Sequence, residues 1–204
     1  MSKGFLAKTY TARDASETRA HYDEWAATYD AEVSGQGYVT PGRCAQALAE
    51  HMPDLTAPVL DFGCGTGLSG MALTRAGFTT LDGIDLSAEM LEHATARGVY
   101  RATLLTEPDV ALPLKPGEYA AIAAIGVIGA GAAAIALFDQ LVAALGPGGR
   151  LVWSFNDHTL QDPANEATVQ ASLDSGATRL LFKEHGPHLT DMEMGSTVYV
   201  IEKT

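Results

Sequence analysis

Short apolar runs alternate with amphipathic segments through most of the chain. The apolar runs predict five strands, over residues 59–62, 79–84, 100–105, 119–126 and 150–155. The amphipathic segments predict helices that each end at a glycine, over residues 68–76, 88–97 and 132–145. Such alternation is typical of βαβ units, so we expect a mostly parallel sheet with helices on its faces.

The pattern changes after residue 155. Asp162-Pro163 predicts the start of a helix that ends near Gly176, and residues 178–184 and 197–202 alternate as an antiparallel pair does. The segment 185–188, His-Gly-Pro-His, is interpreted as the turn between these strands, because no acid or cysteine completes a metal site with its two histidines. The expected sheet therefore has seven strands, of which the last is antiparallel.

The first 54 residues show helical patterns without a strand. Within 14–33, Tyr22, Trp25 and Tyr29 recur at i, i+3 and i+7 and so share one helical face. Thr40-Pro41 predicts the start of a second helix, through about residue 51. We expect residues 1–204 to form a single domain, with 1–54 as a helical cap and 55–204 as its core. The cap is interpreted either as a docked helix or as a lid over a ligand.

The net charge of the chain limits the classes of partner that we expect it to bind. The chain has 13 Lys and Arg against 25 Asp and Glu, a formal net charge of −12, and no three basic residues in a row. Binding to a phosphate backbone is driven by clustered Lys and Arg, so we expect no nucleic acid and no membrane partner. A small-molecule substrate, a monomer or homodimer, and a cytoplasmic location are expected, since the N-terminal residues show no targeting signal. Two cysteines without metal spacing predict free thiols and no metal.

Residues 59–70 run from a strand into a glycine-rich turn and then a helix, an arrangement that cradles ligands. Asp61, just before the turn, is placed to receive a cationic amino group and would repel a pyrophosphate. Asp85 ends the next strand, where a carboxylate can accept both hydroxyls of a ribose. Residues 65–70 also satisfy the dinucleotide pattern GxGxxG, and NAD enzymes use an acid like Asp85, so an NAD-dependent oxidoreductase is one alternative.

At these positions the sequence resembles the class I S-adenosylmethionine-dependent methyltransferases, with the first motif at 59–67 and the second at 83–91. The resemblance spans about residues 20–155. It implies a doubly wound Rossmann-like α/β fold, S-adenosyl-L-methionine as cofactor, and in-line methyl transfer to a small-molecule acceptor. Segments 22–30 and 85–91 look more narrowly like the methyltransferase-like group named for the Williams-Beuren region. A protein that binds the cofactor without activity is a second alternative.

The resemblance also implies roles for single residues. The glycines would line the methionine part of the cofactor with Asp61 near its ammonium, Asp85 would hold the ribose, and Leu86 would face the adenine. Asp109 and Val110 would meet the amino edge of the adenine, and Glu107 is the alternative acid. The expected cofactor-binding residues are Tyr22, Tyr29, Asp61, Gly63, Cys64, Gly65, Gly67, Asp85, Leu86, Asp109, Val110 and Ile125.

Methyl transfer depends mainly on geometry, because the sulfonium is already a good leaving group. A general base is useful if the acceptor is a hydroxyl. Tyr29 in the cap and His158 after the fifth strand are the catalytic candidates, since the end of that strand lies on the ligand side of the sheet. Sequence context singles out none of the four histidines considered as a base, His21, His158, His185 and His188.

Overall fold

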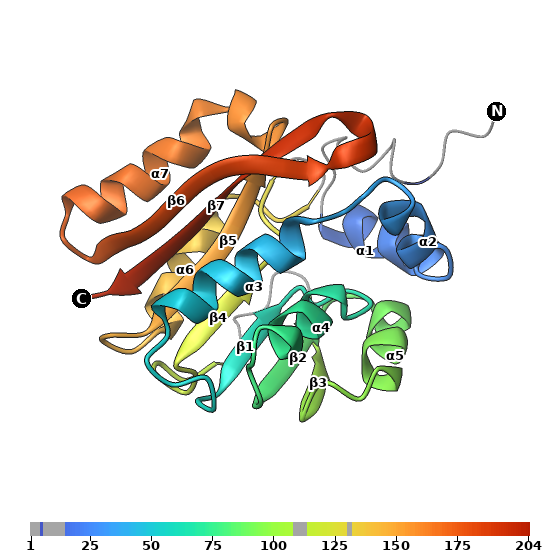
Figure 1. The fold of residues 1–204 in the computed structure, drawn as a ribbon, viewed down its shortest axis with the longest axis horizontal. Helices are drawn as coiled ribbons and strands as arrows, with labels where there is room; N and C mark the ends of the chain where they lie inside the picture. The colour runs from blue at the N-terminus through green and yellow to red at the C-terminus, as the bar shows by residue number, and fades with distance from the viewer. Residues whose placement is uncertain (1–4, 6–14, 108–113, 130–131) are drawn as a thin grey trace.

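One sheet of seven strands organises the molecule (Figure 1). The computed structural model describes residues 5, 15–107, 114–129 and 132–204. The strands, in the spatial order β3-β2-β1-β4-β5-β7-β6, are β1 Val59–Phe62, β2 Leu81–Asp85, β3 Ala102–Leu105, β4 Ala121–Ala124, β5 Arg150–Asn156, β6 Thr178–Leu189 and β7 Met194–Lys203. Strands β1 to β5 pair in parallel, and β7 is antiparallel to both β5 and β6. The predicted doubly wound fold is confirmed.

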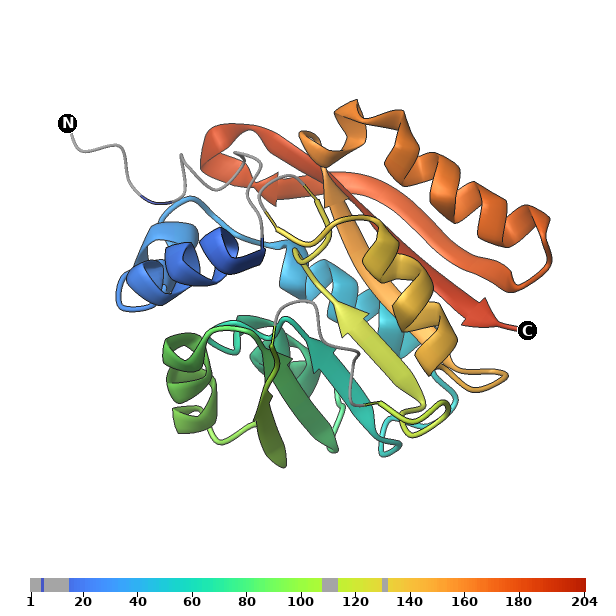
Figure 2. The same ribbon diagram turned by 180° about the vertical axis from the view of Figure 1, so that it is seen from behind.

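Helices cover both faces of the sheet (Figures 1 and 2). They are α1 Ala15–Trp25, α2 Tyr29–Ser34, α3 Thr40–His51, α4 Leu68–Arg75, α5 Ala88–Ala96, α6 Ala136–Ala144 and α7 Pro163–Asp174. Val59 of β1 packs with α3 and α4, while its neighbour Leu60 packs with α6 and α7. This alternation follows from the two-residue period of a strand, and it buries the sheet in two apolar clusters.

The aromatic segment of the cap, residues 15–34, forms two helices rather than one continuous helix. Helix α1 ends at Trp25 and α2 begins at Tyr29. A tight turn interrupts them, in which the Thr28 N–H donates to the Trp25 carbonyl at 3.0 Å. The three predicted aromatic side chains still cluster, because the Trp25 and Tyr29 rings meet edge to face with centroids 4.6 Å apart. The aromatic face was therefore predicted correctly and its helical continuity was wrong.

Two other boundaries differ from the prediction. Residues 185–188 belong to β6, and the chain turns instead through a short 3₁₀ segment, Thr190–Met192. Pro187 lies in an edge strand, where proline is tolerated because only one side of the strand carries ladder bonds. Helix α6 begins at Ala136 because Ala133 first forms an isolated bridge with Ile128. No helix in the described part of the chain is both long and apolar enough to cross a bilayer.

Candidate functional site

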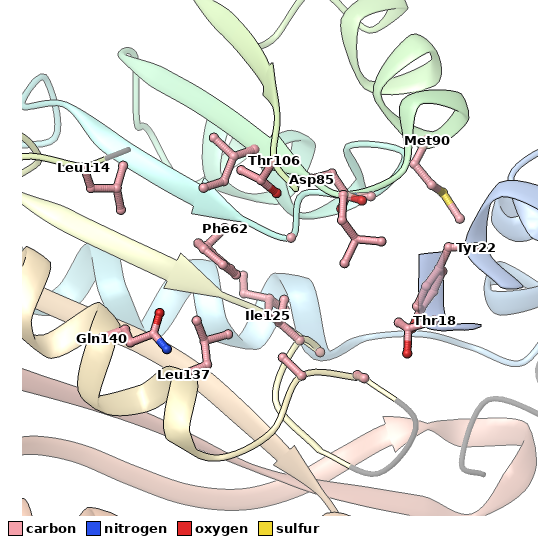
Figure 3. A pocket seen from close by; sticks show the side chains of 18 of the residues that line it. Thr18, Tyr22, Phe62, Asp85, Met90, Thr106, Leu114, Ile125, Leu137 and Gln140 are labelled. Atoms are coloured by element: carbon pink, nitrogen blue, oxygen red, sulfur yellow. The ribbon is translucent and has the colours of Figure 1, made fainter. Parts of the chain in front are cut away.

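A cavity of about 890 Å³ lies at the carboxyl ends of β1, β2 and β4 and is covered by α1 and the start of α2. Strand order reverses between β1 and β4, and ligands of doubly wound sheets bind at such a switch point. Figure 3 shows Tyr22 and Met90 at one end of the cavity and Leu114 and Gln140 at the other. A cavity of this size accommodates a cofactor.

The glycine-rich turn after β1 forms one wall of this cavity. Gly63 and Gly65 have φ values of +66° and +53°, a conformation that side chains disfavour. The N–H groups of the turn are already used, because those of Gly63 and Cys64 donate to the Ile84 carbonyl at 2.8 and 3.0 Å. The Gly67 N–H donates to the Cys64 carbonyl at 2.8 Å. These N–H groups are therefore not free to cradle a pyrophosphate.

Asp85 closes the end of this wall. Its Oδ2 accepts from the Gly65 N–H at 2.8 Å and its Oδ1 from the Ser87 N–H at 2.9 Å. Ser87 in turn caps α5 by accepting from the Met90 N–H at 3.1 Å. Burial raises the pKa of the Asp85 carboxyl, and the backbone N–H donors oppose that rise. The carboxylate is fixed at the cavity with capacity for further donors.

Asp61 lies behind the glycine-rich turn, on the α4 side of the sheet. It is fully buried and lines neither described cavity. Ser69 and Tyr100 each donate a hydroxyl to its Oδ2 at 2.6 Å, whereas its Oδ1 has no partner among the described residues. Burial raises the pKa of Asp61 to about 6. Its predicted place near an ammonium group stays a prediction.

The cap is tied to the cofactor side of the cavity by charged contacts. Asp30 of α2 accepts from the Thr66 hydroxyl at 2.6 Å and pairs with Arg97, whose side chain also reaches the Thr66 carbonyl. Arg19 of α1 pairs with Glu107 at 3.1 Å. We call the Asp30, Thr66 and Arg97 contacts the cap clasp.

A second cavity of about 60 Å³ adjoins the first and shares Tyr22, Tyr29, Gly126 and Ala132 with it. Its remaining lining comes from the segments around α2, β4, β5 and the end of β6: Trp25, Val33, Tyr38, Ile128, Gly129, Ser154, Asn156, Thr159, His188 and Leu189. The described lining of this cavity contains several polar side chains and no Asp, Glu, Lys or Arg. We call this second cavity the polar chamber.

The structure brings most predicted site residues together. Those that line the main cavity are Tyr22, Tyr29, Gly63, Gly65, Asp85, Leu86 and Ile125, and the alternative acid Glu107 joins them. Cys64 is buried behind the turn, and burial raises the pKa of its thiol. Asp109 and Val110 lie outside the described residues. Gly67 is the N-cap of α4 and, like Cys64, does not line the cavity.

The two catalytic candidates, His158 and Tyr29, differ in their position relative to the two cavities. His158 is exposed and lines neither described cavity. Tyr29 lines both, and burial raises its pKa well above the usual value, so its hydroxyl stays protonated at neutral pH. Tyr29 is thus suited to donate a hydrogen bond and unsuited to act as a base. Within the described chain, no three His, Cys, Asp or Glu side chains are grouped to hold a metal ion.

Sequence reasoning missed several lining residues. Thr18 lies one turn before Tyr22 on α1, so the helical period gave a signal for it. Met90 faces the cavity from α5, and Leu137 and Gln140 face it from α6. No local pattern marked these residues, because only the packing of each helix against the sheet decides which side chains reach the cavity.

Comparison with known families decides what kind of domain this is. Residues 59–149 match the model of a family described as a methyltransferase domain. The segment 59–149 is therefore a methyltransferase domain of the class I S-adenosylmethionine-dependent type. The matched segment runs from β1 to the residue before β5 and contains the glycine-rich turn, Asp61 and Asp85.

Curated relatives of this methyltransferase domain act on different acceptors. The human protein named Methyltransferase-like protein 27 is 36% identical over 121 residues, 58% of this chain and 49% of its own. An 18S rRNA (guanine(1575)-N(7))-methyltransferase of Saccharomyces cerevisiae is 31% identical over 54% of this chain and 46% of its own. A trans-aconitate 2-methyltransferase of Sinorhizobium medicae is 32% identical over 67% and 54%. The chain thus spans about half the length of these relatives.

Solved structures share the fold of the domain. The cyclase SpnF superposes with a TM-score of 0.70 at 17% identity, covering 95% of this chain and 98% of its own. A methyltransferase from Thiobacillus denitrificans, solved with S-adenosyl-L-homocysteine, gives 0.54 at 15% identity, covering 79% and 91%. Structural similarity at such low sequence identity shows the fold alone, so the reaction has to be inferred from the residues of the site.

The described residues of the methyltransferase domain fit S-adenosylmethionine. The cavity is large enough, its glycine-rich wall admits close approach, and the fixed Asp85 carboxylate suits a ribose diol. No Lys or Arg among the described residues lines either cavity, which suits a cationic cofactor and would leave a pyrophosphate unpaired. S-adenosylmethionine is the cofactor of this domain family, and the NAD alternative is not favoured.

Proposed function

We propose that the protein transfers a methyl group from S-adenosylmethionine to a small-molecule acceptor. The observation that carries this proposal is the main cavity, in which the Asp85 carboxylate is fixed by the glycine-rich turn beneath the cap. Three of its features support a small acceptor. The cap covers the cavity, the adjoining chamber is small, and neither cavity offers a described Lys or Arg to a phosphate backbone.

The proposed mechanism relies on positioning. S-adenosylmethionine, when bound, would supply a methyl group activated by its sulfonium, so the residues of the chain need mainly to hold and align the two reactants. Asp85 would hold the ribose, and Gly63 and Gly65 would let the backbone approach the methionine part. Tyr22 and Tyr29 of the cap would exclude water from the reacting atoms. The Tyr29 hydroxyl would donate a hydrogen bond.

The remaining expectations become parts of the same proposal. Asp61, Cys64 and Gly67, which do not line the main cavity, would contribute to cofactor binding from the far side of the glycine-rich turn, with Asp61 nearest the ammonium group. Asp109 and Val110 would meet the adenine. We infer that residues 1–204 act as one domain, with 1–54 as its cap, in the cytoplasm and without a nucleic-acid or membrane partner, as a monomer or homodimer. Membership of the group named for the Williams-Beuren region is supported by the 36% identity to the human relative.

A thermal-shift experiment tests the cofactor proposal. A ligand at 100 times its Kd stabilises the folded protein by about 2.7 kcal/mol. We expect S-adenosylhomocysteine to raise the melting temperature and NAD or NADP to leave it unchanged. Stabilisation by NAD or NADP alone would refute the proposal.

Release of S-adenosylhomocysteine then distinguishes an enzyme from a silent binder. The acceptor panel would contain phenols, amines, thiols and carboxylic acids, with an 18S rRNA fragment as a separate arm because one relative is an rRNA methyltransferase. We expect turnover with a member of the small-molecule panel. Turnover with the RNA alone would overturn the acceptor class, and binding without turnover in any arm would favour the silent binder.

A further inference from the structure

The polar chamber contains a histidine that the proposed mechanism does not use. His188 is 6% exposed and lies near the end of β6. The segment before α3 holds it in place, because the Val39 N–H donates to the His188 carbonyl at 3.0 Å and Tyr38 forms an isolated bridge with Leu189. The ring of His188 therefore has a fixed position in the chamber wall.

A chain of buried groups reaches the Nδ1 atom of His188. Arg43 donates to Ser196 Oγ at 3.1 Å, Ser196 Oγ lies 2.9 Å from Thr40 Oγ1, and Thr40 Oγ1 lies 2.8 Å from His188 Nδ1. Thr40 and Ser196 are both fully buried. We call these four side chains, Arg43, Ser196, Thr40 and His188, the relay. Its two hydroxyl groups, those of Ser196 and Thr40, each have a hydrogen-bond partner on both sides.

The direction of the relay follows from counting protons. Arg43 can only donate, so Ser196 Oγ accepts from it. If Ser196 then donates to Thr40, and Thr40 to His188 Nδ1, every hydroxyl proton of the relay is bonded. In the reverse order the proton of the buried Ser196 hydroxyl would have no acceptor within the relay, which costs free energy. The first order therefore places the imidazole proton of His188 on Nε2.

His188 is also neutral. Burial lowers its pKa to about 4, and the nearby Arg43 and His158 act in the same direction, whereas Asp157 opposes them. At neutral pH the ring thus presents an uncharged Nε2–H group, which bonds to no residue of the described chain. A neutral N–H donor seeks an oxygen or nitrogen lone pair rather than a proton.

Asn156 supplies a second donor to the same chamber. Its Oδ1 accepts from the Thr159 N–H at 2.9 Å and from the Thr159 hydroxyl at 3.0 Å, which fixes the amide orientation. Its NH₂ group has no partner within the described ranges. Asn156 also pairs directly with Ser196 across β5 and β7, so it stands beside the relay.

From this arrangement we propose that His188, as its Nε2–H tautomer, and Asn156 bind a neutral hydrogen-bond-accepting oxygen, a carbonyl or hydroxyl of the methyl acceptor. This inference rests on the proposed function and specifies its substrate class. A chamber of about 60 Å³ holds a few water molecules, and hence one small functional group of the acceptor. Because the chamber shares Tyr29 and Gly126 with the cofactor cavity, a group bound there positions the acceptor beside the cofactor.

The tautomer is tested first, on the full chain loaded with S-adenosylhomocysteine. Long-range ¹H–¹⁵N spectra distinguish the two neutral forms of a histidine, and His188→Gln assigns the resonance. We expect the Nε2–H form near pH 7 and a mixture of tautomers in Thr40→Val, where the relay is broken. A dominant Nδ1–H form in the unmodified protein would overturn the inference.

Acceptor binding is tested by titrating acetamide, a small neutral carbonyl compound, into the same loaded protein. We expect it to shift the His188 Nε2–H resonance and to leave the resonances of His93, exposed on α5, unchanged. An unaltered His188 resonance at saturating acetamide would contradict the inference. Failure of S-adenosylhomocysteine to bind at all would instead refute the proposed function.

Kinetics with an acceptor from the panel separate binding from a merely structural role. His188→Ala is expected to raise the acceptor KM about tenfold, the value of one neutral hydrogen bond, with kcat and the Kd of S-adenosylhomocysteine unchanged. His188→Gln, whose amide can place an N–H donor near the same position, should restore most of the loss, and His93→Ala should behave as the unmodified protein. An unchanged KM in His188→Ala would overturn the inference.

Discussion

The two walls of the site are built in different ways. The cofactor wall consists of the glycine-rich turn and the Asp85 segment, whose residues follow two adjacent strands within a short stretch of chain. The chamber wall joins Tyr38, Asn156 and His188, and the hydrogen bond that orients His188 links positions 148 residues apart. A motif recognisable in the sequence therefore forms one wall, while the other exists only after folding.

The walls also differ in charge. Asp85 and Glu107 make the cofactor wall acidic, which complements a sulfonium and an ammonium. The chamber wall offers a neutral imidazole and an amide. Under the proposed function, the cofactor would be recognised through charge and the acceptor through directed hydrogen bonds, which discriminate by geometry.

The largest expected effect comes from breaking the cofactor wall. Asp85→Ala removes the ribose contact and the acceptor of the Gly65 N–H, so the affinity for S-adenosylhomocysteine should fall about 100-fold, as expected when a charged hydrogen-bonding group is lost. Isothermal titration calorimetry measures this, with Glu92→Ala on the exposed side of α5 as the control. An unchanged affinity would place the ribose elsewhere.

Acidification should change the stability contributions of Asp61, buried behind the cofactor wall, and of His188, in the chamber wall, with opposite signs. Asp61 has a pKa of about 6, above its ordinary 3.8, so its contribution to the free energy of unfolding rises as the pH falls from about 7 to 4. His188 has a pKa of about 4, below its ordinary 6.5, so its contribution falls over the same range. Each effect is on the order of 3 kcal/mol, and the two nearly cancel in the unmodified protein.

Urea unfolding of two variants separates these contributions. Relative to the unmodified protein, Asp61→Asn should lose stability on acidification because the favourable term is gone. His188→Gln should gain stability for the converse reason. If both variants followed the unmodified protein across this range, the two groups would not be buried as the structure shows.

One glycine in each wall allows a matched comparison. Gly63 has φ +66°, and an added Cβ would meet Val127 Cγ2 at 2.5 Å; Gly126 has φ +72°, and its Cβ would meet Tyr38 Oη at 2.8 Å. Each alanine variant should lose about 1–2 kcal/mol of stability from backbone strain alone. Gly63→Ala should mainly weaken S-adenosylhomocysteine binding, and Gly126→Ala should mainly raise the acceptor KM. The same defect in both variants would mean that the walls are not separate.

The cap clasp gives the smallest effect. Asp30→Ala removes the contacts with Thr66 and Arg97, but the carboxylate is 44% exposed, so the affinity for S-adenosylhomocysteine should fall only about threefold. The difference should shrink at high salt, because screening weakens an exposed ion pair. Glu24→Ala, on the exposed face of α1, is the control. Equal affinities at low salt would show that the clasp does not hold the cap over the cofactor.

Prediction from sequence succeeded where local patterns suffice. Strands β1, β2, β4 and β5 were placed by apolar runs that are buried in the sheet, and Gly63, Gly65 and Asp85 by their position at strand ends. The edge strand β3 was placed by its apolar run as well, although most of its residues are exposed. It failed where packing overrides a local pattern. Pro187 indicated a turn, yet it lies in the edge strand β6. The apolar period at 132–135 indicated a helix, yet Ala133 forms a bridge with Ile128 and the helix begins only at Ala136.

The sequence by itself determined the class of fold, the glycine-rich turn, and the two carboxylates in β1 and at the end of β2, because these depend on residues that are close in the chain. Tertiary structure alone decided that Asp61 lies behind the turn, that His158 stays outside the site, and that His188 enters it. The physical reason is that a side chain's neighbours across a sheet depend on strand register and edge pairing, which bring together residues that no local pattern relates.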